Sequence, residues 1–439
     1  MRYRALLSSL LFLSCSVHGE TLDDAVAKAV RSDPRIASAQ AQWEGLKARM
    51  ELAARPDLPQ VNFELGRGQN LSDSINTRSV GNQDKFFPRN LSSLTMSMQL
   101  FDAGATKARV DAAGGRAQAG EARVTRATQT TIMDVIQAYQ DVWRSQQLLL
   151  INDENRRVHQ ELVAVIKGRV DAQQASLARL AEVSLRLREI ENERVDLLSQ
   201  LKQSEEAYRL VTGVLPDSEI EIPVEPEDML AILPLDDVEA MVRTALDSHP
   251  EVKASNLLIQ SAGREVNAAK SGVWPSVALE GRQGYDDFNP SSTGGRSTTR
   301  DLGVMLRMRW SLYGNAVPAQ VKEAEATRVQ STAERDRVSR EIERAIRLAL
   351  YGIASDSERV DYLNESVALA EKAVDARQRG LANLSMTEES VLAASGTFTL
   401  RAQARAALVN VGQRKVRSIY SLLEAMGKLP ETFGVTKAF

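Results

Sequence analysis

The chain has 439 residues, with 55 Lys and Arg against 58 Asp and Glu, and its formal net charge is −3. This near balance of interspersed charges argues against a nucleic-acid-binding protein. Aromatic residues make up only 5% and charged residues 26%, which indicates a helix-rich chain with little material for a thick core. The length favours two or more structural units.

The N-terminus is expected to be a targeting segment. Arg2 and Arg4 precede a short apolar run, and permissive residues follow it, so we expect a signal peptide over residues 1–19. Lipidation at Cys15 is the alternative, although the bulky Leu13 fits that signal poorly. Cleavage would leave a mature chain without cysteine, and therefore without disulfides or thiolate metal ligands.

An internal repeat organises the rest of the chain. Pro250 and Pro275 each lie 216 positions after Pro34 and Pro59, and each pair stands in the same succession of helical and alternating patterns. We therefore expect a tandem duplication. The first repeat covers 20–215, with strands at 60–67 and 91–101 and a long helical hairpin at 106–212; the second covers 235–427, with strands at 276–285 and 301–312 and a hairpin at 318–426. Residues 216–234 form a linker or equatorial segment, and 428–439 form a C-terminal tail.

The expected strands alternate apolar and polar residues, and Gly66–Asn90 is expected to be a polar loop between the first two. Such alternation suits a membrane barrel strand, with lipid on one side and water on the other, but an ordinary half-buried hairpin shows it too. In a barrel, Arg307 and Arg309 would line the interior and bias it towards anions; on a hairpin they would form the wet face. Likewise, three aromatic residues at strand ends suit either an interfacial belt or core packing: Phe101, Trp310 and Tyr313.

The expected hairpins carry coiled-coil patterns. From Leu180 to Val211 apolar residues recur at steps of three and four, with only Arg194 and Ser204 interrupting the seam. The long helices could reach ~90 Å at 1.5 Å per residue. Four strands are too few to close a barrel, and open sheet edges cannot face lipid. If these strands enter a membrane, several copies must share one barrel, so the sequence argues for an oligomer.

The chain resembles the TolC-type outer-membrane factor family over nearly all of its mature length. The resemblance rests on the paired openings LDDAV…DP and LDDV…HP, on the Pro59 and Pro275 breaks, on Leu100–Gly104 before the long helix, and on the hairpin ends Arg209–Gly213 and Leu423–Gly427.

This resemblance implies a mainly α fold with a small β part, in which duplicated coiled-coil hairpins accompany four strands per chain. It implies a homotrimer with a twelve-stranded barrel in lipid of the bacterial outer membrane and a long helical periplasmic tunnel. It also implies docking onto a periplasmic adaptor (a membrane fusion protein) and an inner-membrane ABC or other export transporter.

Two positions depart from the family pattern. Leu312–Asn315 replaces a Phe-Asp-Gly-Gly-like turn, and Gln173 stands where a glycine is expected in the first hairpin's tip. The first tip is therefore placed near Ala172–Arg179. In the second hairpin Gly380 fits the tip glycine, although counting back from Gly427 puts the tip seven residues later.

Residues near the two tips are the candidate gate and docking residues. Glu388 and Glu389 could form an acidic ring that favours cations where three chains meet, although a solvated helix face is the preferred interpretation. Arg169, Asp171 and Gln173 could contact an adaptor or simply form an exposed helix end.

Enzyme chemistry has little support, and we expect no catalytic residue, metal site or cofactor. After cleavage only His159 and His249 remain, and neither has partners at metal-ligand spacing. Gly114 and Gly115 indicate close helix packing or a local irregularity of the helix rather than a site. The expected function is an exit duct for type I protein secretion; the alternatives are a drug-efflux duct or, in another class, a periplasmic adaptor or structural coiled-coil protein.

Overall fold

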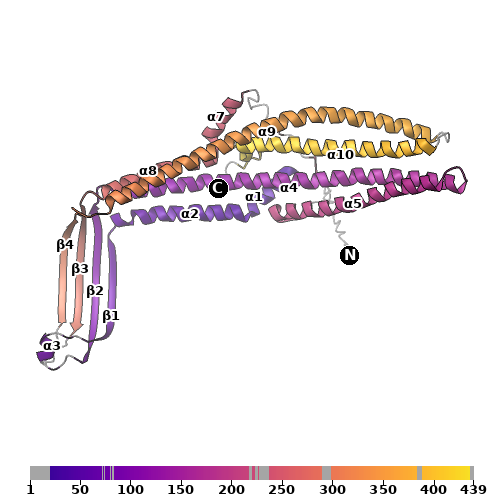
Figure 1. Ribbon diagram of the computed structural model, residues 1–439. Coiled ribbons are helices and arrows are strands. Elements are labelled where there is room, and N and C mark those ends of the chain that lie inside the picture. Colours follow the sequence, from indigo (N-terminus) through magenta and orange to yellow (C-terminus); the bar gives the residue numbers. More distant parts are fainter. Residues whose placement is uncertain are drawn as a thin grey trace, which may run out of the picture. The chain divides into compact units, whose positions relative to one another are not determined.

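The computed structural model describes residues 20–71, 73, 75–79, 81, 84–216, 220–222, 226, 237–288, 298–382 and 388–435. The expected signal peptide, most of the expected linker and the last four residues of the tail lie outside these ranges. The described chain is mainly helical and contains one four-stranded sheet, which confirms the expected fold class (Figure 1). None of the helices in these ranges has an apolar stretch long enough to cross a membrane.

The two halves of the chain carry the same series of elements. The first half contains α1 (Leu22–Ser32), α2 (Pro34–Ala54), β1 (Gln60–Leu71), α3 (Ile75–Ser79), β2 (Phe86–Phe101), α4 (Ala105–Asp171) and α5 (Leu177–Thr212). The second contains α7 (Val238–Ser248), α8 (Pro250–Ser271), β3 (Ser276–Phe288), β4 (Thr298–Arg309), α9 (Val317–Ala382) and α10 (Glu388–Ala425), followed by the short α11 (Leu429–Thr432).

Side-chain caps explain where several helices begin. Thr21 accepts a hydrogen bond from the backbone N–H of Asp24 at the start of α1, and Ser176 accepts one from Arg179 at the start of α5. Asp102 accepts bonds from the N–H groups of Gly104 and Thr106 at the start of α4. Each cap satisfies N–H groups that have no partner within the helix.

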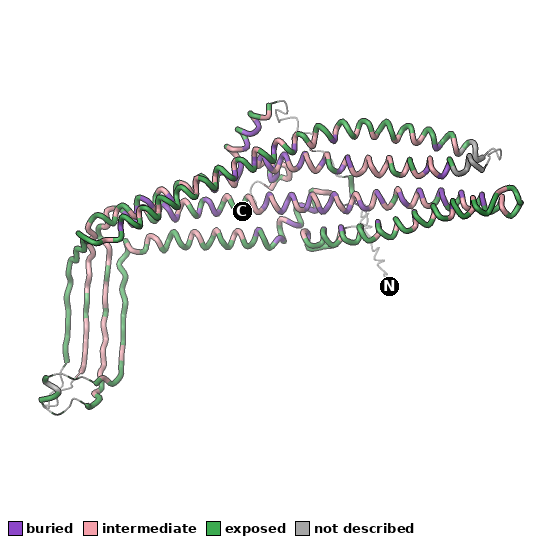
Figure 2. The backbone as a smooth tube through the Cα atoms, in the orientation of Figure 1, coloured by how far each residue is buried: buried purple, intermediate pink, exposed green. Residues whose placement is uncertain are grey.

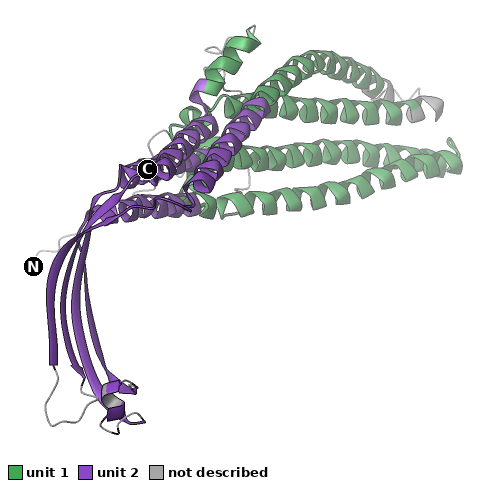
Figure 3. Cartoon of the chain, turned by 60° about the vertical axis from the view of Figure 1, so that its left-hand side comes forward, with its two compact units in different colours: residues 1–36, 127–246, 342–439 green, residues 37–126, 247–341 purple. Residues whose placement is uncertain are grey.

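The chain folds into two compact units, which do not coincide with the two repeats (Figure 3). Unit 1 combines residues 1–36, 127–246 and 342–439, and unit 2 combines 37–126 and 247–341. Each unit therefore draws elements from both halves of the sequence. Unit 2 holds the sheet and the helical segments next to it, while unit 1 holds both helical hairpin ends.

The sheet of unit 2 is antiparallel throughout, in the order β1-β2-β3-β4. Its strands run further than expected towards the hairpin turns, where β3 reaches Phe288 and β4 begins at Thr298. The expected loop Gly66–Asn90 is too long at both ends, because β1 continues to Leu71 and β2 begins at Phe86. At the other end β4 stops at Arg309, so the last three residues of the expected strand lie beyond it. Cross-strand pairing, which the pattern of a single strand does not reveal, extends both hairpins beyond their expected bounds.

The hairpin seams of unit 1 follow the predicted heptad spacing. On α5 the buried residues include Val183, Ile190, Leu197 and Ser204, each seven positions after the last (Figure 2). Contrary to the expectation that Ser204 interrupts the seam, this residue is part of it. It is buried and donates to the backbone oxygen of Leu201, and its hydroxyl lies 3.4 Å from that of a second seam serine on α4. The hydroxyl is thus tolerated because it has partners.

Candidate functional site: the sheet and the hairpin tips

The two faces of the sheet differ in polarity. By register, Phe63 lies beside Leu94 on one face, and the apolar residues of β4 share that face. On β4 these side chains are open to solvent, with Leu302 82% and Leu306 67% exposed. Figure 2 shows β4 exposed along its whole length. Exposure of a row of large apolar side chains to water is unfavourable, so the row marks a face that meets lipid or protein.

Two strands of the sheet have an unpaired edge. Within the described chain β1 pairs only with β2, and β4 pairs only with β3. Unpaired backbone N–H and C=O groups on an edge are a template for another strand. The single chain thus presents two open edges and an apolar face together.

The opposite face of the sheet carries the charged residues. Arg307 and Arg309 both lie on it, as expected from their alternation. Arg307 forms an ion pair with Glu280 of β3 at 2.7 Å, and Arg89 pairs with Asp286 at 2.6 Å. The charge of Arg307 is therefore balanced by a neighbour, which the sequence pattern did not reveal.

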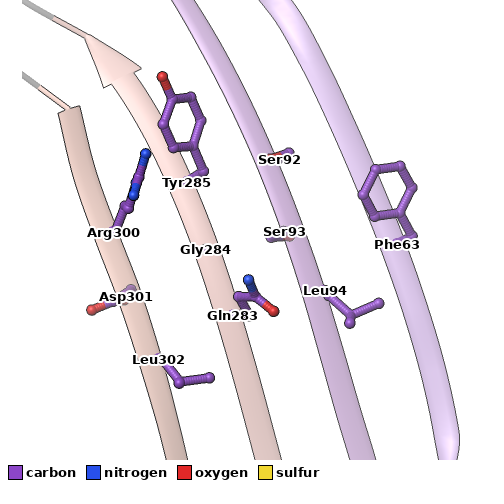
Figure 4. Close-up of a pocket in the computed structure, with 10 residues that line it drawn as sticks. All are labelled: Phe63, Ser92, Ser93, Leu94, Gln283, Gly284, Tyr285, Arg300, Asp301 and Leu302. Carbon is purple, nitrogen blue, oxygen red and sulfur yellow. The ribbon is translucent and has the colours of Figure 1, made fainter.

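A shallow hollow crosses the middle of the sheet (Figure 4). It is lined from all four strands by residues that include Phe63, Leu94, Tyr285 and Leu302. The guanidinium of Arg300 lies 5.9 Å from the ring centre of Tyr285, within reach of a cation–π interaction. The lining is largely that of the apolar face, so the hollow is part of that surface.

The first hairpin turns over residues 172–176, between α4 and α5. Gln173, at the position of the expected glycine, has φ 58° and so adopts the left-handed conformation that glycine adopts most easily. Its N–H donates to the carbonyl of Val170, and the next N–H donates to that of Arg169. Asp171, the last residue of α4, and Gln173 are exposed, while Arg169 is half-buried. The structure thus brings these three candidate residues together at one tip.

In the second hairpin α9 ends at Ala382 and α10 begins at Glu388, and residues 383–387 lie outside the described ranges. Gly380 does not form the turn, because α9 continues through it to Ala382. Glu388 and Glu389 are the first residues of α10. Their side chains are not among those described, so the acidic ring stays a prediction.

Ion pairs between helices of unit 1 are functional candidates that sequence reasoning missed. Glu154 of α4 lies 3.0 Å from Arg401 and 2.8 Å from Arg405, both on α10. Arg405 also pairs with Glu371 of α9 at 2.6 Å. These charges tie the first hairpin to the second. Partners some 250 positions apart leave no local signal in the sequence.

The two remaining histidines are buried rather than placed among ligands. His159 is 0% exposed, and its ring nitrogens lie 2.9 Å from the backbone oxygen of Asn155 and 3.1 Å from the hydroxyl of Ser395. Burial lowers the pKa of His159. Burial likewise lowers the pKa of His249 to about 4. Among the residues that the structure describes, no three His, Cys, Asp or Glu side chains are grouped to hold a metal ion.

Two described residues of the expected linker contact the N-terminal segment and the first hairpin. Ile220 forms a parallel bridge with Glu20, and the hydroxyl of Tyr139 lies 2.8 and 2.9 Å from the carbonyl oxygens of Glu20 and Glu221. Tyr139 is fully buried, and burial raises its pKa. A segment from the middle of the chain is thereby anchored to α4.

Comparison with known proteins identifies the class to which this fold belongs. The fold is that of VceC, an outer membrane protein of Vibrio cholerae: the TM-score is 0.75 at 17% identity, over 92% of this chain and 96% of that one. Among relatives by sequence, the outer membrane efflux protein BepC of Brucella suis is 24% identical, over 97% of this chain and 89% of its own length. The proteases secretion protein PrtF of Dickeya chrysanthemi is also 24% identical, over 98% and 94%.

The family model for outer membrane efflux proteins matches residues 25–214 and 241–428. The chain therefore belongs to the outer membrane efflux protein family, which confirms the resemblance seen in its sequence motifs. It is an outer-membrane protein of a family of efflux channels, not of enzymes.

Proposed function

We propose that the chain is the outer-membrane exit duct of a tripartite export system and that it works as a homotrimer. The observation that carries this proposal is the sheet with two unpaired edges and one exposed apolar face. Backbone groups cannot stay unpaired in lipid, so β4 of one copy must pair with β1 of the next. Three copies close a twelve-stranded barrel, the number that the resemblance implies.

The polar face of the sheet would then line the lumen. Arg307, Glu280 and Arg89 lie on that face, where water can solvate them. The apolar face would meet lipid, in the arrangement typical of outer-membrane barrels. Trp310 and Phe101, about half exposed beside the helix-side ends of the strands, would lie in the interfacial belt.

The hairpin tips would meet the other two components. Asp171 and Gln173 are exposed at the first tip and are proposed to contact a periplasmic adaptor. Opening the duct would require the two hairpins to separate, which would break the ion pairs of Glu154 with Arg401 and Arg405. The energy would come from an inner-membrane transporter, since the chain has no nucleotide-binding motif.

A test of the duct itself uses the chain's lack of cysteine after cleavage. Ser79, an exposed residue of α3 at the far end of the sheet (Figure 1), is replaced by cysteine and treated on whole cells with a thiol reagent that cannot cross membranes. Labelling from outside, together with a cross-linked trimer in the outer-membrane fraction, is the expected result. A soluble monomer that is labelled only after cell lysis would refute the proposal and favour an adaptor or a structural coiled-coil protein.

For the cargo we propose type I protein secretion. PrtF, by its name a protease secretion protein, and BepC, by its name an efflux protein, are each 24% identical to this chain. Efflux of small molecules is therefore the second candidate. Deletion of the gene distinguishes them: loss of specific proteins from the culture medium is expected for secretion. Sensitivity to small toxic compounds with an unchanged set of secreted proteins would favour efflux.

A further inference from the structure

A second hollow of unit 2 lies where the strands meet the helices, and its lining is positively charged. Arg109 of α4 and Arg309 at the end of β4 both line it. Three serine hydroxyl groups also line it, those of Ser271, Ser276 and Ser311. Guanidinium and hydroxyl groups are donors suited to oxyanions such as carboxylate and phosphate.

Neither arginine has an ion pair among the described residues. Asp102 is the carboxylate that also lines the hollow, but both its oxygens accept backbone N–H groups, of Gly104 at 3.0 Å and Thr106 at 2.6 Å. These bonds hold Asp102 as the cap of α4. By contrast Arg307, two residues before Arg309 on the same face, is neutralised by Glu280. The hollow thus contains cationic groups that its own acid does not bind directly.

Two helix starts add to the positive potential of the hollow. Thr106 in the first turn of α4 and Gln320 in the first turn of α9 both line it. The N-terminal end of a helix carries a partial positive charge and favours anions. Arg309 pairs in register with Ser276, on the polar face of the sheet. The hollow therefore opens on the face that carries the charged residues and not on the apolar one.

We propose that Arg109 and Arg309, with the hydroxyls of Ser276 and Ser311, form a binding site for an oxyanion, and that its ligand is a carboxylate or phosphate group on the cargo. The link to cargo rests on the proposed duct, because only there does the polar face line the passage. Three copies would place six arginines around that passage, where they would retain anionic groups as they move from the helical part to the sheet.

Binding is tested with inorganic phosphate as the probe. The full-length protein, purified in detergent, is titrated by isothermal calorimetry, and one phosphate is expected per chain. Arg109→Gln and Arg309→Gln should each weaken binding about tenfold, since each removes a charge-assisted hydrogen bond. Arg300→Gln is the matched control, because Arg300 lies on the same strand but on the opposite face by register, and its affinity should be unchanged. Far-UV circular dichroism checks that each variant is folded.

Three results would overturn the site. One is the absence of saturable phosphate binding to the wild-type chain, and another is equal affinity in wild type and both hollow variants. A loss of affinity in Arg300→Gln as large as in Arg309→Gln would also overturn it, because binding would then follow net charge alone.

A separate readout distinguishes failure of the site from failure of the duct. In planar bilayers, phosphate added on one side should block the conductance of the wild-type channel. The Arg309→Gln channel should need a phosphate concentration about tenfold higher for half-maximal block. Conductance without phosphate block would overturn the cargo assignment and leave the duct intact. Phosphate binding in calorimetry by a protein that forms no trimer and no channel would overturn the duct, and with it the assignment to cargo, but not the oxyanion site. If phospholipid headgroups delivered in vesicles blocked the channel more strongly than free phosphate does, the site would be assigned to lipid instead.

Discussion

Asp33 and His249 hold the same position in the two halves of the chain, 216 residues apart, and each caps the helix that follows it. Asp33 accepts the backbone N–H of Arg35 at 2.8 Å at the start of α2. The Nδ1 atom of His249 accepts that of Glu251 at 3.2 Å at the start of α8. A carboxylate and an imidazole thus satisfy the same unpaired donor. Both side chains are buried, at 7% and 2% exposure.

The caps predict a loss of stability in acid that differs between the two halves. Burial, followed by the charge of Arg126, lowers the pKa of His249 to about 4, below the value of about 6.5 in an unfolded chain. The stability that His249 contributes is present above pH 6.5 and is lost as the pH falls towards 4, because the unfolded chain then binds the proton more tightly. Protonated imidazole also cannot accept the N–H of Glu251. Integrating the pKa shift of His249 over pH gives a loss of about 2 kcal/mol in the free energy of unfolding at pH 5.

The variant His249→Asn keeps a capping acceptor without a titratable ring. Its thermal unfolding midpoint, followed by circular dichroism, should fall less than that of wild type between pH 7 and pH 5. Asp33 titrates lower: burial alone would raise its pKa, but hydrogen bonds from Arg35 and Thr131 hold the pKa below its ordinary value. Its contribution should therefore be lost only below about pH 4. An equal fall of the thermal unfolding midpoint between pH 7 and pH 5 in wild type and His249→Asn would contradict this explanation.

The left-handed Gln173 predicts that glycine stabilises the first tip. A non-glycine residue at φ 58° costs roughly 1 kcal/mol, so Gln173→Gly should raise the free energy of unfolding by up to about that amount. Gln174→Gly, at the neighbouring exposed position without a positive φ, should give no gain, because it only adds freedom to the unfolded chain. Hydrogen exchange of the backbone amides at the ends of α4 and α5 measures the stability change in both variants. Faster exchange in Gln173→Gly would show that the turn is not strained.

The charges between the hairpins predict a salt-dependent stability. Glu154→Gln removes a partner of Arg401 and one of the two acidic partners of Arg405, and should lower the free energy of unfolding by roughly 1–2 kcal/mol at low salt. The deficit should shrink in 1 M salt, where charges are screened. Glu161→Gln on the same helix is the control, since its pair with Arg157 is exposed and 3.6 Å long. Equal thermal midpoints of the two variants at low salt would mean that the hairpins are not held by Glu154.

Glycines on facing helices of unit 2 predict opposite effects. A Cβ atom at Gly115 of α4 would lie 3.3 Å from the Cβ of Ser261 and 3.4 Å from the backbone oxygen of Leu257, both on α8. Gly115→Val should therefore destabilise the protein by about 1–3 kcal/mol through overpacking. Gly263 of α8 faces open space, so Gly263→Ala should stabilise by up to about 1 kcal/mol through helix propensity. Thermal unfolding of both variants checks the sign, and destabilisation by Gly263→Ala would show that this face is covered in the assembly.

Several features could be predicted from the sequence because local patterns encode them. The heptads of α5 and the alternation that puts Arg307 and Arg309 on one face depend on side-chain spacing along one element. The offset between the proline pairs predicted the matching helices and strands. It also places His249 opposite Asp33, a signal from which the shared cap could have been inferred. The close packing expected at Gly115 is confirmed by its distance to Ser261.

The elements, their repeat, the polarity of the sheet's two faces and the need for a partner at its edges could all be read from the sequence. Periodicity and backbone geometry, on which they depend, act over a few residues. The tertiary structure alone decided which charges are balanced: Arg307 by Glu280, and Glu154 by arginines about 250 positions away, whereas Arg109 and Arg309 stay unpaired in the described chain. It also decided that His159 is buried against Ser395. Such pairings depend on distances between segments remote in sequence, which folding sets and no local pattern records.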